Sequence, residues 1–510
     1  MALYGLPPEI LSLILQAIDS ITDLHSLISG SVAFYRTFLS SQELILSSVL
    51  KNAILPDALP HALAALNAPA ASEDSRIALT PETKVFLDHY FSNKRFGFPS
   101  DRDTIVRLSC LHIRVSRFVD DYFAQAFRPI KTVHQLRRDL SVWPIQRSSA
   151  ASEHGTSASQ VSSPLSATEL ARIQRAFYRY EVYCKAFPAD DSPFGGSLLP
   201  SAYQANMFLE KVECWEVEEM SCVHMYLSSL IGEVLDSLED RFVSAVLSSA
   251  ALEHSPPRHL PQWRHHAPSP DPTGGPQILR GTIVGHSDDT PIYSPSTAPL
   301  ASHDGGEDLH QQQDEMVNFH DLAAYIEFND EFHGLDLFTD FGKHDSDEPI
   351  SYMCSLGVDF IYDLLLTDAQ ERKDILKYCT ASRVFLCEAL LWTPPPRVQY
   401  AKSLECVDGR VQYAKISGWV DGSPSTCNLG WREYGSPKVG VSGLSFGESS
   451  LQARGYVFWD SQRIRLPEFE EPYPKKVRAN LDRSKRKSAQ SRLKGLAVPH
   501  SELKRIVEEF

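Results

Sequence analysis

The sequence has no closely spaced cysteine pair, no uncharged apolar stretch of membrane length and no excess of positive charge. Its nine cysteines are scattered without a Cys-x-x-Cys pair, which is typical of buried or incidental thiols in a reducing compartment. The apolar run from Met1 to Leu15 contains Glu9 and lacks a basic segment before it, so we expect no secretory signal. Without a stretch of about 20 apolar residues, we expect no membrane contact either. The expected location is the cytoplasm, the nucleus or both.

The charge balance argues against a general nucleic-acid-binding protein. The chain carries 49 Lys and Arg against 65 Asp and Glu, a formal net charge of -16, whereas phosphate backbones must be neutralised by clustered cations. Acidic residues dominate from Asp304 to Glu348. Residues 468–510 are expected to form a basic C-terminal tail, which is either a nuclear-import signal or a solvated, flexible run. The basic residues that define it are Lys475, Lys476, Arg478, Arg483, Lys485, Arg486 and Lys487.

By composition, the 510 residues divide into a globular part and two stretches that cannot form a core. Hydrophobic residues make up 43% of the chain, enough for a large core, and their helical periodicity predicts a mainly α fold. We expect a small three-helix head at residues 1–50, followed by an irregular multi-helix domain at 78–467. Residues 148–166 are rich in Ser and Ala, and residues 255–313 in Pro, Ser, His and Gly. These compositions predict disordered insertions.

Apolar residues spaced three and four apart mark the expected helices. In the head, the prolines before Glu9 suit a first helical turn, and Glu9 itself favours the positive end of the helix dipole. The chain beyond Val407 is rich in Gly, Ser and aromatic residues, which allows short strands. Segment 397–402 recurs as 410–415, which indicates a local duplication or an incorrect gene model. The expected helices lie at 10–18, 22–28, 42–50, 104–127, 169–187, 207–252, 322–328, 352–366 and 369–392.

No constellation of polar residues supports an enzyme. Gly443–Gly447 fits the Gly-x-Ser-x-Gly pattern of α/β-hydrolases, but no buried apolar strand precedes it and too little chain follows for a triad. The histidines around His265 and His266 have no cysteine or carboxylate at ligand spacing. Glu218 and Glu219, as consecutive helical residues, point in different directions. We therefore expect no catalytic residue, no metal and no cofactor, and a hydrolase is the least favoured alternative.

The head opens with Leu6-Pro7-Pro8-Glu9 and then Ile10-Leu11; Asp23-Leu24 and Leu27 follow after a short break. This order of residues resembles the F-box, a small three-helix module in which Leu-Pro-x-Glu, an Ile-Leu pair and an Asp-Leu pair recur. The match is closest over the first helix. Further along, Gly30, Val32 and Tyr35 stand where the family has Val, Lys and Arg.

The resemblance implies that the head docks on the Skp-type adaptor of cullin-RING ubiquitin ligases. Independently of the family, a module this short is not expected to bury a core of its own, so its apolar residues should contact the body or another chain. The adaptor-binding residues that the resemblance implies are Leu6, Pro7, Glu9, Ile10, Leu11, Ile14, Leu15, Leu24 and Leu27.

Three phrases in the remainder, Gln174–Glu181, Trp215–Glu219 and Gly455–Asp460, resemble a fungal F-box-like group. That resemblance supports fold and class and implies no substrate. We therefore expect a protein-interaction adaptor, the substrate-receptor subunit of a Skp/cullin-type ubiquitin ligase, with an unknown protein target. The alternative is a helical scaffold protein with a vestigial F-box that only completes the core.

Overall fold

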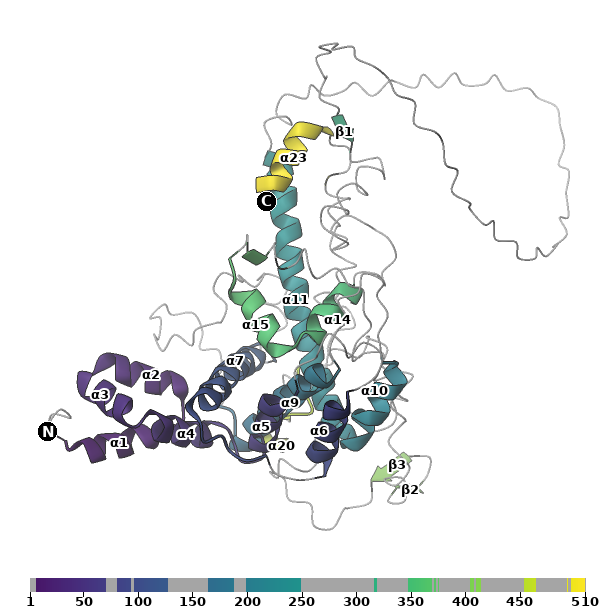
Figure 1. The fold of residues 1–510 in the computed structure, drawn as a ribbon. Coiled ribbons are helices and arrows are strands. Elements are labelled where there is room, and N and C mark those ends of the chain that lie inside the picture. Colours follow the sequence, from purple (N-terminus) through teal and green to yellow (C-terminus); the bar gives the residue numbers. More distant parts are fainter. Residues whose placement is uncertain are drawn as a thin grey trace, which may run out of the picture.

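The computed structural model describes residues 6–69, 80–92, 96–126, 164–187, 199–248, 316–318, 347–368, 371–372, 375, 404–407, 410–413, 454–464, 493 and 497–509. Most of these residues are helical, and strands are confined to two short antiparallel pairs among them, so the predicted mainly α fold class is confirmed. Figure 1 shows a small N-terminal head beside a helical body, from which one long helix projects.

The head contains four helices where we predicted three. They are α1 (Pro8–Gln16), α2 (Ile21–Gly30), α3 (Val32–Ser40) and α4 (Gln42–Ala53). Ser20 caps α2, because its side chain accepts a hydrogen bond from the Asp23 amide. Helix α3 was not predicted, and its apolar residues lie on both sides: Phe34 is buried, whereas Val32 and Tyr35 are exposed.

The head has its own core, and the expectation that it would lack one was wrong. The core forms because α3, which was not predicted, and α4 together cover the apolar faces of α1 and α2. The buried residues of this head core are Leu11, Leu15, Leu24, Phe34, Ile45 and Val49.

Helix α9 (Ala167–Ala186) is the centre of the body, and all residues from Ala171 to Cys184 are buried. The helices that contact it most extensively are α5 (Leu59–Asn67), α7 (Arg102–Ala126), α11 (Cys214–Ser248) and α15 (Gly357–Leu366). The remaining described elements are α6 (Pro81–Phe91), α10 (Ser201–Met207), η3 (Leu209–Lys211), α14 (Asp347–Ser355), α20 (Ser461–Ile464), α23 (His500–Glu509), β1 (Met316–Asn318), β2 (Leu404–Val407), β3 (Arg410–Tyr413) and β4 (Ala497–Pro499).

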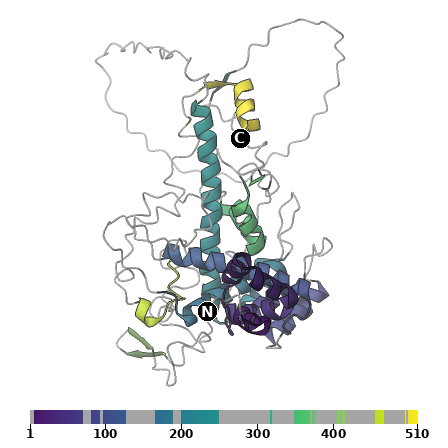
Figure 2. The ribbon, with the colours of Figure 1, turned by 90° about the vertical axis from the view of Figure 1, so that its left-hand side faces the viewer.

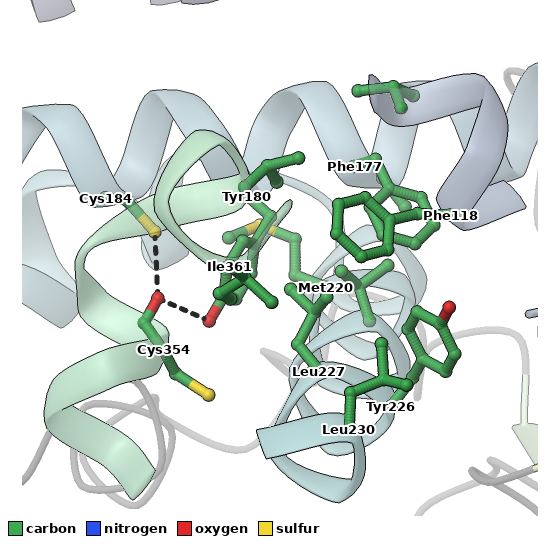
Figure 3. Close-up of a cluster of buried hydrophobic side chains, with 14 of the residues drawn as sticks. Phe118, Phe177, Tyr180, Cys184, Met220, Tyr226, Leu227, Leu230, Cys354 and Ile361 are labelled. Carbon is green, nitrogen blue, oxygen red and sulfur yellow. Dashed lines mark hydrogen bonds between the residues drawn. The ribbon is translucent and has the colours of Figure 1, made fainter. Parts of the chain in front are cut away.

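Aromatic rings fill the space around α9 (Figure 3). Phe118 of α7 stacks on Phe177 of α9 at a centroid distance of 5.9 Å, and Tyr226 of α11 meets both rings edge-on. At the other side of this cluster, the Tyr180 hydroxyl donates a hydrogen bond to the Cys354 carbonyl. The same carbonyl oxygen accepts a second hydrogen bond from the Cys184 thiol. The chain of contacts joins α7, α9, α11 and α14 in one core.

Helix α11 is about 50 Å long at 1.5 Å per residue, and its distal half rises out of the body (Figure 2). Its distal end is covered by α23, whose Leu503 and Ile506 are buried. Strand β4 precedes α23 and pairs with β1. The C-terminal residues 497–509 are therefore folded, which corrects the prediction that 468–510 is a tail throughout.

Several predicted boundaries also shift. The helix predicted over 207–252 is divided into η3 and α11, preceded by α10, which ends at Met207, and the one over 352–366 breaks between α14 and α15. Ser166 was assigned to a disordered insertion, but it caps α9 through a reciprocal pair of hydrogen bonds with Glu169. Pro164 and Leu165 of that insertion are also described, whereas residues 148–163 and all of 255–313 lie outside the described residues. So do the predicted helix 322–328 and nearly all of 369–392.

Glycine is required at the joint between α14 and α15. Gly357 has φ +91°, and a Cβ there would lie 2.7 Å from Oε2 of Glu181. The same oxygen accepts a 2.7 Å hydrogen bond from the Val358 amide at the start of α15. Any side chain at 357 would displace this buried carboxylate from the helix end that it caps.

We expect Gly357→Ala to lower the free energy of unfolding by roughly 1–3 kcal/mol, from backbone strain and the displaced carboxylate. Urea unfolding followed by circular dichroism measures the loss. Gly30→Ala is the matched control, because a Cβ at Gly30 has nothing within 4 Å and should leave stability unchanged or slightly higher. Equal effects of the two substitutions would contradict the role given to Gly357.

Candidate protein-binding surface

Exposed apolar side chains concentrate on the head. Ten large hydrophobic residues are exposed in the described part of the chain, and six of them belong to α1, α3 and α4. The other four, Val85, Val106, Leu247 and Leu366, are scattered over different helices of the body. The six residues of the head surface are Ile10, Leu13, Val32, Tyr35, Leu39 and Leu44.

The spacing of these residues aligns them along two helices. Ile10 and Leu13 are three apart on α1, whereas Val32, Tyr35 and Leu39 follow one side of α3. Helices α1 and α3 contact each other, and the head packs against α7 of the body through α2 and α4. Figure 1 shows α3 at the outer end of the head. Five of the six residues of the head surface therefore lie on α1 and α3, whereas the contacts with α7 are made by α2 and α4.

Three of the nine residues predicted to bind an adaptor are used inside the head. Leu11, Leu15 and Leu24 are at most 4% exposed and form the head core, so their assignment as contact residues is corrected. The cause is helix α3, which was not predicted. It packs on the side of α1 and α2 that we expected a partner to cover.

The other predicted residues divide into two groups. Leu6, Ile14 and Leu27 are partly buried and pack against the head core. Pro7, Glu9 and Ile10 are exposed. Sequence reasoning missed Leu13, Val32, Tyr35, Leu39 and Leu44, although apolar residues on more than one side of α1 were a signal that one side would remain uncovered.

The head is held firmly on the body. The Asn52 side chain of α4 donates hydrogen bonds to the carbonyls of Gln16 (2.9 Å) and Ile18 (3.1 Å), which fixes the end of α1. Ile21 and Leu46 pack against both the head core and the body core. A partner bound to the head would consequently keep a fixed orientation to the body.

In the body, the phrases Gln174–Glu181 and Trp215–Glu219 meet through buried ion pairs. Arg175 Nη2 lies 2.6 Å and 2.8 Å from the two carboxylate oxygens of Glu219, and Arg179 Nη2 lies 2.9 Å from Glu216 Oε1. Burial alone would raise the pKa of Glu216, but the guanidinium groups of Arg179 and Arg175 hold it below its usual value. These pairs set the register of α9 against α11.

The third phrase, Gly455–Asp460, lies against the start of α9. Arg172 Nη1 is 2.8 Å from Asp460 Oδ1, and Arg463 Nε is 2.8 Å from Glu169 Oε1. The three phrases therefore meet at α9. The first lies within this helix, the second contacts it through Glu219, and the third contacts it through Asp460. Their sequence signal reflects packing of the body core.

The buried histidines of the body are structural. His112 shares hydrogen bonds with Tyr178 (2.7 Å) and Ser116 (3.2 Å), and His224 lies 3.1 Å from the Tyr180 hydroxyl. Burial lowers the pKa of both imidazoles to about 4. Each ring is therefore neutral at physiological pH, fills space in the core and forms hydrogen bonds with its neighbours.

Among the described residues, no group of three or more His, Cys, Asp and Glu could hold a metal ion. Glu218 accepts a hydrogen bond from Tyr456, while Glu219 faces Arg175, so the two carboxylates diverge as expected. No helix among the described residues is both long and apolar enough to cross a bilayer.

Three predictions fall outside the described residues: the basic set from Lys475 to Lys487, the Gly443–Gly447 motif, and the histidines around His265. The acidic stretch 304–348 does so except for 316–318 and 347–348. No protein-family model matches the sequence, and neither a curated protein nor a solved structure is significantly similar to it.

Proposed function

We propose that this chain is a protein-interaction adaptor, the substrate-receptor subunit of a Skp/cullin-type ubiquitin ligase. Its head binds the Skp-type adaptor through the head surface, and its body presents a protein target. Catalysis belongs to the other subunits of such a ligase, and this chain contributes no catalytic residue. It acts in the cytoplasm, in the nucleus or in both.

One observation carries the proposal: six of the ten exposed large hydrophobic side chains gather on a module of fewer than 50 residues. Contiguous apolar surface on a soluble protein marks a site where another molecule binds. The head also has its own core and packs against α7 of the body, so the helices that carry this surface are held in place. The F-box-like residues Leu6–Leu11 lie at the start of the same module.

The rival proposal is a helical scaffold whose head only completes the fold. Its support is the continuity between head and body, in which Ile21 and Leu46 contact both cores. That reading leaves the head surface without a partner. Adaptor binding separates the two proposals directly.

We expect Ile10→Ser combined with Leu13→Ser to weaken binding of a purified Skp-type adaptor at least tenfold, because both side chains are exposed on α1. Immobilised full-length chain and titrated adaptor give the affinity. The unfolding midpoint should stay unchanged, since neither residue belongs to the head core.

The matched control is Val85→Ser combined with Val106→Ser, which removes two exposed apolar side chains from the body. It should bind the adaptor as the unmodified chain does. Absence of adaptor binding by the unmodified chain, or equal binding by both double variants, would favour the scaffold.

A further inference from the structure

A short stretch near the C-terminus is buried against the body, and the side chains of α7, α9 and α11 that it contacts form the walls of the groove that it fills. This closing segment, Arg454–Ile464, contacts α7, α9 and α11. Phe458 and Trp459 are fully buried. The Phe458 ring meets Tyr122 of α7 edge-on at 5.7 Å, and the Trp459 ring meets Phe123 at 6.1 Å. Two adjacent aromatic anchors in closed pockets are the usual energetic centre of a peptide interface.

Charged groups on both sides complete the fit. Asp460 accepts 2.6 Å hydrogen bonds from the hydroxyls of Ser166 and Thr168, and Arg172 reaches its other oxygen. Burial raises the pKa of Asp460, but these three donors lower it by more, so the carboxylate is ionised. It occupies the positive end of the α9 dipole.

Arg463, three residues after Asp460, carries the opposite charge and pairs with Glu169. The Arg463 guanidinium donates to both oxygens of Glu169, at 2.8 Å and 2.9 Å, and also to the Pro164 carbonyl. At the other end of the closing segment, the Tyr456 hydroxyl donates to Glu218 of α11. The groove therefore recognises an aromatic pair followed by an acid and then an arginine, in a fixed order.

The closing segment holds its own shape. The Phe458 amide donates to the Gly455 carbonyl at 2.8 Å, and the Trp459 indole donates to the Arg454 carbonyl at 2.6 Å. Gly455 has φ +62° and approaches Tyr122 so closely that a Cβ would lie 2.5 Å from its hydroxyl. A segment that is folded onto itself loses little conformational freedom on binding, as a good ligand should.

Along the chain, the closing segment is remote from the groove. The α9 residues that bind Asp460 precede it by nearly 300 positions, and residues 376–453 separate it from Ile375 near the end of α15. Its contacts with the groove are aromatic contacts and hydrogen bonds, most of which involve side chains. Covalent continuity does not require that this particular segment fill the groove.

We propose that the groove between α7, α9 and α11 is the target-binding site of the body, closed in cis by Arg454–Ile464. The target it fits is a peptide with the pattern Gly-Tyr-Val-Phe-Trp-Asp-x-x-Arg or a close relative. The closing segment then acts as an intramolecular competitor, which a target displaces when its local concentration is high. This inference rests on the proposed receptor function, because it names the class of target.

The test uses the full chain and a fluorescent peptide with the sequence of residues 453–465. Asp460→Ala combined with Arg463→Ala should loosen the chain's own closing segment while leaving the groove residues Glu169 and Arg172 in place. We expect the peptide to bind this variant at least tenfold more tightly than it binds the unmodified chain. A peptide that carries Trp459→Ala should bind neither.

Two outcomes would overturn the proposal. One is failure of the peptide to bind the variant while its circular dichroism matches the unmodified chain. The other is unfolding of the variant, which would make the closing segment a permanent part of the core. Adaptor binding by the variant is measured in parallel, and it depends on the head alone, so loss of peptide binding is distinguishable from failure of the receptor proposal.

Discussion

Replacing Arg175 by methionine is expected to lower the free energy of unfolding by about 3–5 kcal/mol, because one partner of a buried ion pair is removed. Arg175 and Glu219 are 3% and 1% exposed, and they share two hydrogen bonds shorter than 3 Å. Without the guanidinium, the Glu219 carboxylate is left in the core with its charge uncompensated. Urea unfolding at pH 7.5 measures the loss.

Two further variants decide whether the uncompensated charge is the cause. Arg175→Met combined with Glu219→Leu should recover most of the stability, since both charges are then absent. Arg114→Met, which breaks a half-exposed pair with Asp359, should cost less than about 1 kcal/mol. If the double variant were as unstable as the single one, lost packing would explain the effect better than charge.

Acid is expected to destabilise the body through its buried histidines, beginning near pH 6.5. The unfolded chain takes up protons on His112 and His224 near pH 6.5, whereas the native chain does so only near pH 4, because burial lowers both pKa values to about 4. Stability is therefore constant above pH 6.5 from this cause and falls between pH 6.5 and 4. The loss at pH 5 is roughly 2 kcal/mol per histidine.

Urea unfolding at pH 7.5, 6.5, 5.5 and 5.0 gives the slope of stability against pH. His112→Asn removes one of the titrating groups, so this variant should show a shallower slope below pH 6.5 than the unmodified chain. His25→Asn, at an exposed position on α2, is the control and should leave the slope as it was. An unchanged slope in the His112 variant would contradict the contribution assigned to His112.

The helices of the body were predictable where one apolar stripe faces the core. Helix α7 was expected at 104–127 and occupies Arg102–Ala126, because its buried residues recur at helical spacing. Helix α9 was also expected, but its central position was not. Local sequence does not predict that Arg172, Arg175 and Arg179 are buried. Only partners at distant positions, such as Glu219 and Asp460, make their burial possible.

The head surface was partly predictable. Apolar spacing predicted a small helical module at the start of the chain, and Ile10 lies on the exposed side of its first helix. Periodicity alone could not assign the sides of α1, since apolar residues surround much of that helix and α3 was not recognised. Which side is buried depends on Phe34, Ile45 and Val49, which come from later helices. Side assignment in a small helical module thus requires the complete set of helices.

The distance in sequence between Ser166 and Asp460 has a consequence for synthesis of the protein. At 5–20 residues per second, a ribosome needs about 15–60 s to add the 294 residues between them. During that time α9 lacks the carboxylate that holds Arg172, and the pockets for Phe458 and Trp459 stand open. The head, whose core residues all lie between Leu11 and Val49, is complete long before. The head can therefore fold before the body is complete, and during that interval Tyr122 and Phe123 lack their contacts with Phe458 and Trp459.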